Sequence, residues 1–304
     1  MNERTPRSVQ EYLDQLRHAL RDADAALRQD ALYDAEEYLR AELNGKSDRP
    51  ESEVIAAIVN TYGAPEEVAE IYRQTEETVS RAMRTPAPRR RQGLAGRFFA
   101  IYADPRAYSS LFYMFLALAT GIFYFAWTAA GISISLGVSL LIIGLPLFLL
   151  FLGSIRLFSL LEGRIVETFL GVRMPRRPEY PAQDDGIVDR IINMLKDVRT
   201  WSTMLYMLLM MPLGIVYFAA AVSLVSASLS LIASPLVYLF AESWDFHLHF
   251  FYWDGQSHDL TGLESLLLCL AGFLLLTLSL HLFRVIGALQ GNIARGLLVK
   301  PGRD

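Results

Sequence analysis

The sequence predicts an all-α integral membrane protein with four transmembrane helices in two parallel repeats, preceded by a soluble helical bundle. The chain has 304 residues, of which 53% are hydrophobic, and its mean hydropathy is +0.28. Residues 111–155 and 201–241 contain no Asp, Glu, Lys or Arg, and neither do residues 265–283. A transmembrane helix needs about 20 apolar residues. These stretches therefore predict membrane spans. Similarity between the two halves of the membrane part predicts the two repeats.

Residues 1–84 are predicted to form four helices. The first begins with a Ser-x-x-Glu capping box at residues 8–11, which satisfies free amides of the first turn. The second ends at Asn44-Gly45, the third covers residues 51–62, and the fourth begins at Pro65, because proline fits the first turn of a helix. The segment holds 11 basic and 18 acidic residues, a net charge of −7. That sign argues against direct nucleic-acid binding. A partner-docking bundle and a solvated bundle without a partner both remain open.

Three motifs in this segment resemble the HTH-associated α-helical signalling (HAAS) domain over residues 8–75. The resemblance implies a cytoplasmic helical module that is attached to membrane segments and paired with a PadR-like transcriptional regulator, here a separate protein. The motifs are Tyr12-Leu13-Asp14-Gln15-Leu16, Asp34-Ala35-Glu36-Glu37-Tyr38-Leu39 and Tyr62-Gly63-Ala64-Pro65-Glu66-Glu67-Val68-Ala69.

A basic linker of proline and arginine covers residues 85–96. Its three consecutive arginines, Arg89, Arg90 and Arg91, are interpreted as an interfacial anchor beside the membrane. Contact with anionic lipid is the alternative, at about 1 kcal/mol for each basic residue near the surface.

The membrane part is predicted to be built twice, as residues 97–178 and residues 179–304. Residues 97–126 are identical to residues 190–219 at 12 of 30 positions, including polar positions such as the Asp-x-Arg pairs. Further along the chain, the cytoplasmic end of the first copy aligns with that of the second copy at an offset of 128 residues. Each copy is expected to contain an interfacial helix, two spans and an amphipathic tail. Because both copies begin on the same side, the repeats are parallel.

The distribution of basic residues predicts the topology. None of the 28 Lys and Arg residues lies in 241–264, an acidic loop, and basic residues near span ends stay in the cytoplasm. We therefore expect a multi-pass protein of the bacterial inner membrane, with both termini cytoplasmic and the acidic loop outside. The spans are predicted at roughly residues 109–129, 134–154, 202–222 and 265–283.

The doubled membrane part resembles the sensor domain found at the N-terminus of many actinobacterial histidine kinases, over about residues 97–300. The resemblance implies a sensory role, and because no kinase follows, the N-terminal bundle is expected to be the output module. The second copy departs from the pattern, since Ser234-Pro235 stands where the first has Gly-Leu-Pro. The motifs are Gly121-Ile122-Phe123-Tyr124-Phe125, Ile143-Gly144-Leu145-Pro146 and Leu170-Gly171-Val172.

Asp104 with Arg106, and Asp197 with Arg199, occupy corresponding membrane entries of the two repeats. They are candidates for contact with a lipid headgroup or between the repeats. The ordinary alternative is an acid at a helix start beside an arginine whose charged end reaches the interface.

A candidate divalent-metal site lies in the acidic loop. Imidazole and carboxylate groups suit zinc or copper, and Asp245, His247 and His249 alternate along one side of an extended segment, with His258 nearby. The competing interpretation is an aromatic interfacial anchor, because tryptophan and tyrosine favour the headgroup region.

We expect a sensory or regulatory membrane protein that relays a signal to a cytoplasmic regulator. No enzyme motif is present, so we expect no catalysis, and no cofactor apart from the candidate metal. Charge-free spans argue against the alternative, a small-molecule or lipid transporter, since intramembrane charges mark transport pathways. A structural membrane scaffold stays open. Membrane lipids are expected partners, and formation of a homo-oligomer is left open.

Overall fold

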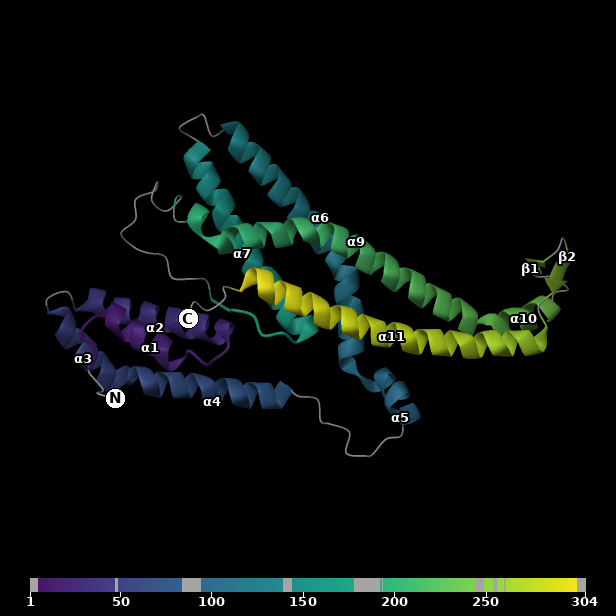
Figure 1. Ribbon diagram of the computed structural model, residues 1–304, viewed down its shortest axis with the longest axis horizontal. Coiled ribbons are helices and arrows are strands. Elements are labelled where there is room, and N and C mark those ends of the chain that lie inside the picture. The colour runs from purple at the N-terminus through teal and green to yellow at the C-terminus, as the bar shows by residue number, and fades with distance from the viewer. Residues whose placement is uncertain are drawn as a thin grey trace. The chain divides into compact units, whose positions relative to one another are not determined.

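The computed structural model describes residues 5–46, 49–83, 94–138, 144–177, 192, 194–243, 249–253, 256–259 and 261–299. The chain is helical through most of this range, which confirms the predicted fold class (Figure 1). It divides into two compact units. The first contains residues 1–89, 130–206 and 292–304, and the second contains residues 90–129 and 207–291. Three long helices, α6, α9 and α11, contribute to both units.

The first unit begins with a bundle of four helices, here called the HAAS bundle after the domain that its sequence motifs resemble. These are α1 (Val9–Ala19), α2 (Ala25–Gly45), α3 (Glu51–Tyr62) and α4 (Pro65–Met83). Fully buried apolar side chains from all four helices form its core, so the bundle has a hydrophobic centre of its own. Members of that core are Tyr12, Leu16, Leu39, Ile55 and Ala69.

Helix ends in the bundle follow local sequence signals. The Ser8 Oγ accepts a hydrogen bond from the Glu11 amide at 3.2 Å, as the capping box predicts, and the Glu11 carboxylate accepts from the Arg7 amide at 2.8 Å. Gly63 ends α3 with a φ of +114°, a conformation that glycine adopts without steric cost. The Tyr12 hydroxyl donates to the Gly63 carbonyl at 2.9 Å and ties α1 to this turn.

Four helices are long and apolar enough to cross a membrane: α6 (Pro105–Val138), α7 (Gly144–Leu170), α9 (Val198–Ile232) and α11 (Gly262–Leu298). The predicted number is confirmed. The shorter elements beside them are α5 (Leu94–Phe99), η1 (Ala100–Ala103) and α10 (Ser234–Ser243).

The second span is displaced from its predicted position. A turn was expected near residue 130, but α6 continues to Val138, and α7 begins at Gly144 with Pro146 in its first turn. The segment predicted as an amphipathic tail after this span is therefore the C-terminal half of α7. Proline favours the first turn of a helix, so Pro146 indicates where this helix starts.

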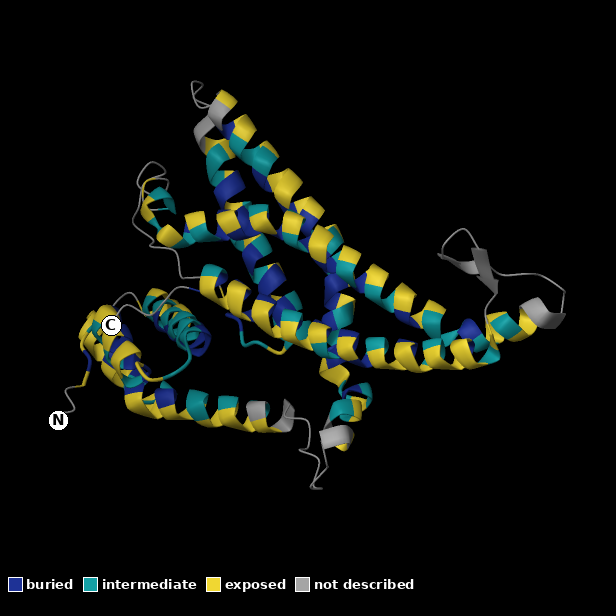
Figure 2. Ribbon diagram, turned by 45° about the vertical axis from the view of Figure 1, so that its right-hand side comes forward, coloured by how far each residue is buried: buried dark blue, intermediate teal, exposed yellow. Residues whose placement is uncertain are grey.

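Many residues of the long helices are exposed (Figure 2), and large apolar residues are among them. Leu150 on α7 is 71% exposed and Leu270 on α11 is 66% exposed. An apolar surface of this extent would be unfavourable in water and is expected for helices that face lipid.

Within the second unit, α6 and α9 meet at a pair of corresponding glycines. A Cβ atom on Gly121 would lie 2.4 Å from the carbonyl oxygen of Met210, and one on Gly214 would lie 2.4 Å from that of Ala117. The two glycines are 93 residues apart, as are the two facing residues, so each repeat offers the other the same surface. Small residues let helix backbones approach closely in membranes.

The expectation that the spans carry no charged residue is wrong for α7. Because this helix lies further along the chain than predicted, it includes Glu162, which is fully buried. The Tyr206 hydroxyl donates to the Glu162 carboxylate at 2.9 Å. In the other repeat, Gln290 occupies the corresponding position and donates to the Tyr113 hydroxyl at 3.3 Å. A buried polar group in a membrane helix needs such a partner.

The described part of the acidic loop forms a two-stranded antiparallel hairpin, β1 (His249–Trp253) and β2 (Gln256–Asp259). His249 lies opposite Asp259, and a bulge separates this pair from the rest of the ladder. The loop therefore adds a small extended element to the mainly helical part of the chain that the structure describes.

Candidate functional site

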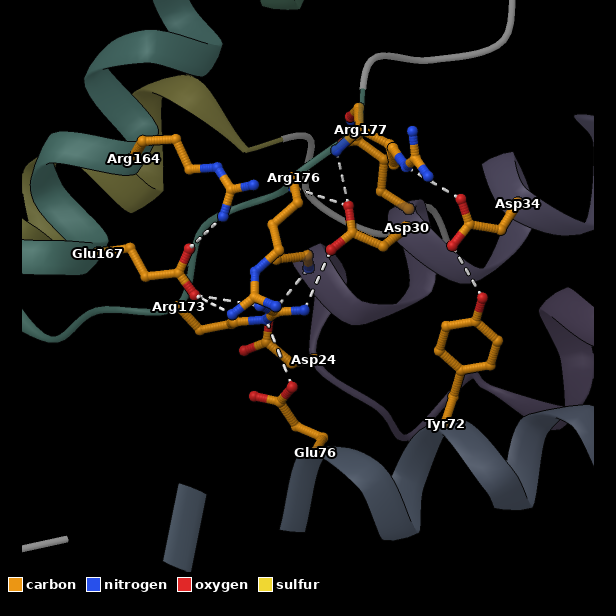
Figure 3. A network of polar contacts seen from close by, with 12 residues as sticks. Asp24, Asp30, Asp34, Tyr72, Glu76, Arg164, Glu167, Arg173, Arg176 and Arg177 are labelled. Carbon is orange, nitrogen blue, oxygen red and sulfur yellow. Dashed lines mark hydrogen bonds and ion pairs between the residues drawn. The ribbon is translucent and has the colours of Figure 1, made fainter. Parts of the chain in front are cut away.

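The candidate site is the contact between the HAAS bundle and the chain that follows α7, both within the first unit (Figure 3). Gly171, with a φ of +69°, ends α7, and its amide donates to the Glu167 carbonyl at 3.1 Å. The chain then leaves the helix and presents Arg173, Arg176 and Arg177 to the bundle. We call residues 173–177 the arginine segment. Pro175 within it lacks an amide hydrogen and prevents helix continuation.

Asp30 on α2 is the centre of the contact. One carboxylate oxygen, Oδ1, accepts from the backbone amides of Arg176 at 2.7 Å and Arg177 at 2.9 Å. The other, Oδ2, accepts from the Arg173 guanidinium at 3.1 Å. The Asp30 side chain is only 7% exposed. A buried carboxylate is stable only where several donors replace its hydration, and the arginine segment supplies three of them.

Arg173 joins the bundle to the end of α7. Besides Asp30, its guanidinium contacts the Glu167 carboxylate at 3.0 Å and that of Glu76 on α4 at 3.6 Å. The Arg176 side chain also donates to Glu167, at 2.9 Å. Glu167 belongs to α7, so its bonds connect a membrane helix to two of the three arginines that hold Asp30.

A second group of contacts surrounds Arg177. Its guanidinium lies 3.0 Å from the Asp34 carboxylate and 5.6 Å from the centre of the Tyr33 ring, both on α2. The other Asp34 oxygen accepts from the Tyr72 hydroxyl of α4 at 2.9 Å. The Gln29 side chain donates to the Arg177 carbonyl at 2.6 Å. The segment therefore touches the bundle through both its backbone and its side chains.

Two more residues of the first unit hold the beginning of α2. Arg199 at the start of α9 donates to the Gln29 side chain at 3.1 Å, and Arg295 near the end of α11 forms an ion pair with Asp24. The bundle is thus bonded to the segment that follows α7, to the start of α9 and to the end of α11.

Burial and nearby charges shift the pKa of Asp30 in opposite directions. Burial raises the pKa of Asp30 above its usual value, although the bonds from Arg176, Arg177 and Arg173 oppose that shift. The hydrogen bond to Glu167 raises the pKa of Arg176. Removing an ion from water is costly and is compensated only by close, well-oriented partners. The contact therefore depends on its full set of partners.

The predicted pairs at the membrane entries have well-defined surroundings. The Asp104 carboxylate accepts from the Arg106 amide at 3.0 Å and contacts Arg284 at 2.9 Å. In the same way, the Asp197 carboxylate accepts from the Arg199 amide at 3.1 Å, and it contacts Arg156 at 3.4 Å.

The partners are exchanged between the repeats. The aspartate of the first repeat contacts an arginine of the second, and the aspartate of the second contacts an arginine of the first. The Arg106 side chain is exposed. Both aspartates thus start a helix and bridge two elements, while lipid contact remains a proposal for these residues.

Several predicted site residues lie outside the described part of the chain. They are the anchor residues Arg89, Arg90 and Arg91, and the candidate metal ligands Asp245 and His247. The backbone of His249 and His258 is described in the hairpin, but their side chains are not. Among the residues that the structure describes, no group of three or more His, Cys, Asp or Glu could hold a metal ion. The metal site in the acidic loop stays a prediction.

The arginine segment and Asp30 were not recognised as site residues from the sequence. The arginines contributed only to the topology argument. One signal was available: Gly171 and Pro175 interrupt the helical pattern in a stretch with three arginines, and the N-terminal segment has a net charge of −7. Their partners on α2 cannot be read from spacing, because the bonded residues lie more than 140 positions apart.

Comparison with known families agrees with this architecture. The family model described as "Putative sensor" matches residues 113–298, more than half of the chain. The chain belongs to this sensor family. A second family model, HAAS, matches residues 11–71, within the bundle. Both resemblances drawn from the sequence motifs are confirmed. No curated protein and no solved structure matches the chain.

The two families and the four spanning helices describe a membrane-bound sensory and signalling protein. HAAS domains associate with regulatory partners. The candidate site joins the HAAS bundle to the sensor part of this chain, since the arginine segment lies within the sensor match and Asp30 lies within the HAAS match.

Proposed function

We propose that this protein senses a membrane or extracellular signal and relays it to a PadR-like transcriptional regulator by changing how the arginine segment holds the HAAS bundle. The observation that carries the proposal is the triple contact of Asp30 with Arg173, Arg176 and Arg177. It joins the sensor part to the signalling part through bonds that can be broken and remade as a set.

The chemistry of the contact suits a switch. It consists of ion pairs and hydrogen bonds, whereas the bundle keeps a separate apolar core. We therefore expect the bundle to fold without the segment. Net gains from such bonds are modest, on the order of 1–3 kcal/mol when one partner is charged. A contact of this strength can lie close to equilibrium between held and released states, and a signal then needs only a small difference in affinity to shift it.

Glu167 is the proposed point of transmission. It lies near the C-terminal end of α7 and bonds Arg173 and Arg176 at 3.0 and 2.9 Å. A movement of this helix end of about an ångström would lengthen both bonds beyond the usual range of a hydrogen bond. The arginines would then lose their orientation toward Asp30.

The proposal also assigns the sides of the membrane. The absence of Lys and Arg from 241–264 supports a protein of the inner membrane with both termini in the cytoplasm. The HAAS bundle would then face a cytoplasmic regulator, while the acidic loop would face outside. We propose no catalytic step, because signalling by release of a bound module requires none.

The test compares Arg173→Gln with the wild type, as full chains in lipid nanodiscs. Hydrogen exchange should become faster in residues 25–34 of α2, and the affinity for a purified PadR-like regulator should change at least several-fold. Arg164→Gln is the matched control. Arg164 contacts Glu167 at 3.6 Å, but its side chain is 56% exposed. Exposed pairs contribute little, so both measurements should stay at wild-type values.

Two outcomes would contradict separate parts of the proposal. Faster exchange with unchanged regulator affinity would exclude a relay through the arginine segment. If no PadR-like protein binds the wild type or the variant, the identity of the partner is wrong.

A further inference from the structure

We propose that a phosphate group binds in a small cavity between α7 and the first turn of α9. The cavity has a volume of about 40 Å³, and its lining includes Arg156 and Ser159 of α7 and Arg199, Thr200 and Thr203 of α9. All of these residues belong to the first unit. A water molecule needs roughly 10–15 Å³ by this measure, so the space admits two or three oxygen atoms of a ligand.

Thr200 provides the first observation in favour of a ligand. Its residue is 3% exposed, and its side-chain oxygen is buried without a hydrogen-bond partner. Buried hydroxyl groups are nearly always bonded, and each exception needs an explanation. A hydroxyl that lines a polar cavity and is satisfied by a bound oxygen is such an explanation.

The charge of the cavity indicates an anion. Arg156 and Arg199 both line it, and it adjoins the N-terminus of α9, where the helix dipole favours negative charge. Asp197 offsets part of this charge, but its contact with Arg156 is long, at 3.4 Å. Two arginines and one aspartate leave a net charge of +1. A phosphodiester carries a charge of −1, which matches the headgroup linkage of an anionic membrane lipid.

The first repeat provides an internal comparison. The residue that corresponds to Thr200 is Ala107, which has no hydroxyl group. The ion pair that corresponds to Arg156 with Asp197 is Arg284 with Asp104, and it is tighter, at 2.9 Å. The unbonded Thr200 hydroxyl and the longer Arg156–Asp197 ion pair thus both occur at the start of α9, where the cavity lies.

This inference goes beyond the proposed relay and does not depend on it. Arg199 takes part in both features, because it lines the cavity and also donates to Gln29 of the HAAS bundle. Ligand binding can nevertheless be measured without the bundle's partner, so a failure of one proposal leaves the other in place.

The experiment titrates dioctanoyl-phosphatidylglycerol, and separately inorganic phosphate, into the purified full chain and follows binding by calorimetry. Thr200→Val keeps the size of the side chain and removes its hydroxyl, so phosphate affinity should fall about tenfold. Arg156→Gln should weaken binding tenfold or more. Arg284→Gln, at the corresponding place in the other repeat, should change the affinity less than twofold.

A stability measurement separates binding from packing. Thr200→Val also removes an unsatisfied buried group, so its melting temperature without ligand should equal or exceed that of the wild type. Binding of the lipid without binding of inorganic phosphate identifies a lipid headgroup, and binding of both with the same dependence on the variants identifies a general phosphate site. Either outcome supports the proposal. It is overturned if Thr200→Val and Arg156→Gln bind as the wild type does, or if Arg284→Gln loses as much affinity as they do.

Discussion

At the scale of single residues, Asp30 shows how a carboxylate can be buried by donors that water could replace. Its three donors come from a segment that follows a membrane helix. Loss of the segment would leave the carboxylate to be hydrated again. Hydration thus competes directly with the arginine segment for the same oxygen atoms.

We expect Asp30→Ala to release the arginine segment while the bundle stays folded. The change removes the acceptor of the Arg176 and Arg177 amides, at a cost of about 1–3 kcal/mol. Hydrogen exchange at these two amides should accelerate by roughly one to two orders of magnitude, since 1.4 kcal/mol corresponds to about a factor of ten. Unchanged exchange would mean that the amides are protected by something other than Asp30.

The same residue predicts a direction of pH dependence. Burial raises the pKa of Asp30, so the folded protein binds a proton at this carboxylate more tightly than the unfolded chain does. The Asp30 contribution to stability is therefore complete below the usual carboxyl pKa and declines as pH rises through the raised value. The free energy of unfolding measured across this window should show the decline in the wild type. In Asp30→Asn the decline should be absent, which separates Asp30 from the neighbouring carboxylates.

The histidines of the acidic loop carry a separate prediction. If the loop binds zinc or copper, replacing His247 and His249 together by alanine should abolish binding, as followed by calorimetry on the purified protein. Neutral imidazole is the ligand, so wild-type binding should weaken as pH falls through about 6.5. Equal affinity in the double variant, or no binding by the wild type, would leave the loop as an aromatic interfacial anchor.

Repetition of residues indicated Asp104 and Asp197 as important, but it could not indicate their partners. Asp-x-Arg recurs at the start of both α6 and α9, which is visible in the sequence. The contacts to Arg284 and Arg156 depend on how helices far apart in the chain meet, and no local pattern encodes that. Asp30 was harder still to predict, because it occurs once and belongs to an ordinary amphipathic helix.

At the scale of helices, the crossing of α6 and α9 depends on the absence of two side chains. Gly121 and Gly214 each lie where a Cβ atom would meet the backbone of the facing helix. The backbone cannot yield as a flexible side chain can, so a larger residue must separate the helices. Overpacking of this kind costs typically 1–3 kcal/mol.

We therefore expect Gly121→Ala to destabilise the membrane part by about 1–3 kcal/mol, and Gly214→Ala to have a similar effect. Gly153→Ala is the matched control. A Cβ atom on Gly153 would meet nothing within 4 Å, and alanine favours a helix interior more than glycine does. This variant should equal or exceed the wild type in thermal unfolding in detergent. A loss in the control as large as in the two crossing variants would show that the close approach is not the cause.

The HAAS bundle should fold when it is separated from the membrane part. Residues 1–84 contain the complete buried core of the four helices, including Tyr12 and Ile55. We expect the excised segment to be helical by circular dichroism and to bind its regulator. It should not bind duplex DNA, because its net charge is −7. DNA binding with a steep salt dependence would contradict this interpretation.

Helix positions were predictable where the sequence carries a strong boundary signal. Pro65 and Gly63 fixed the turn between α3 and α4, and the predicted boundaries agree with the structure. The boundary between α6 and α7 was misplaced because residues 130–155 are uniformly apolar. Hydropathy indicates that such a stretch lies in the membrane but not where it turns, whereas Pro146 marks the first turn of α7.

At the scale of the whole molecule, charge distribution predicts orientation without reference to any contact. The 28 basic residues are found everywhere except in the loop between α9 and α11 and within the apolar stretches. The positive-inside rule then places this loop opposite to both termini. The four spanning helices agree with that assignment, because an even number of spans returns the chain to the side from which it began.

Cysteine labelling of intact cells tests the orientation. The natural Cys269 is first replaced by serine, and single cysteines are then introduced as Gln256→Cys and Tyr180→Cys. A membrane-impermeant reagent should label position 256 and leave position 180 unlabelled until the cells are opened. The reverse pattern would invert the topology and place the HAAS bundle outside the cell.

The exchange of polar partners between the repeats has a consequence for biosynthesis. When α7 has just left the ribosome, Asp104, Arg156 and Glu162 already exist, but Arg284, Asp197 and Tyr206 have not yet been made. The nascent first half thus carries polar groups whose partners from the second half are still missing, and such groups are costly in lipid. Its helices are then expected to remain beside the insertion machinery until α9 and α11 arrive. Assembly of the membrane part would be completed only at the end of translation.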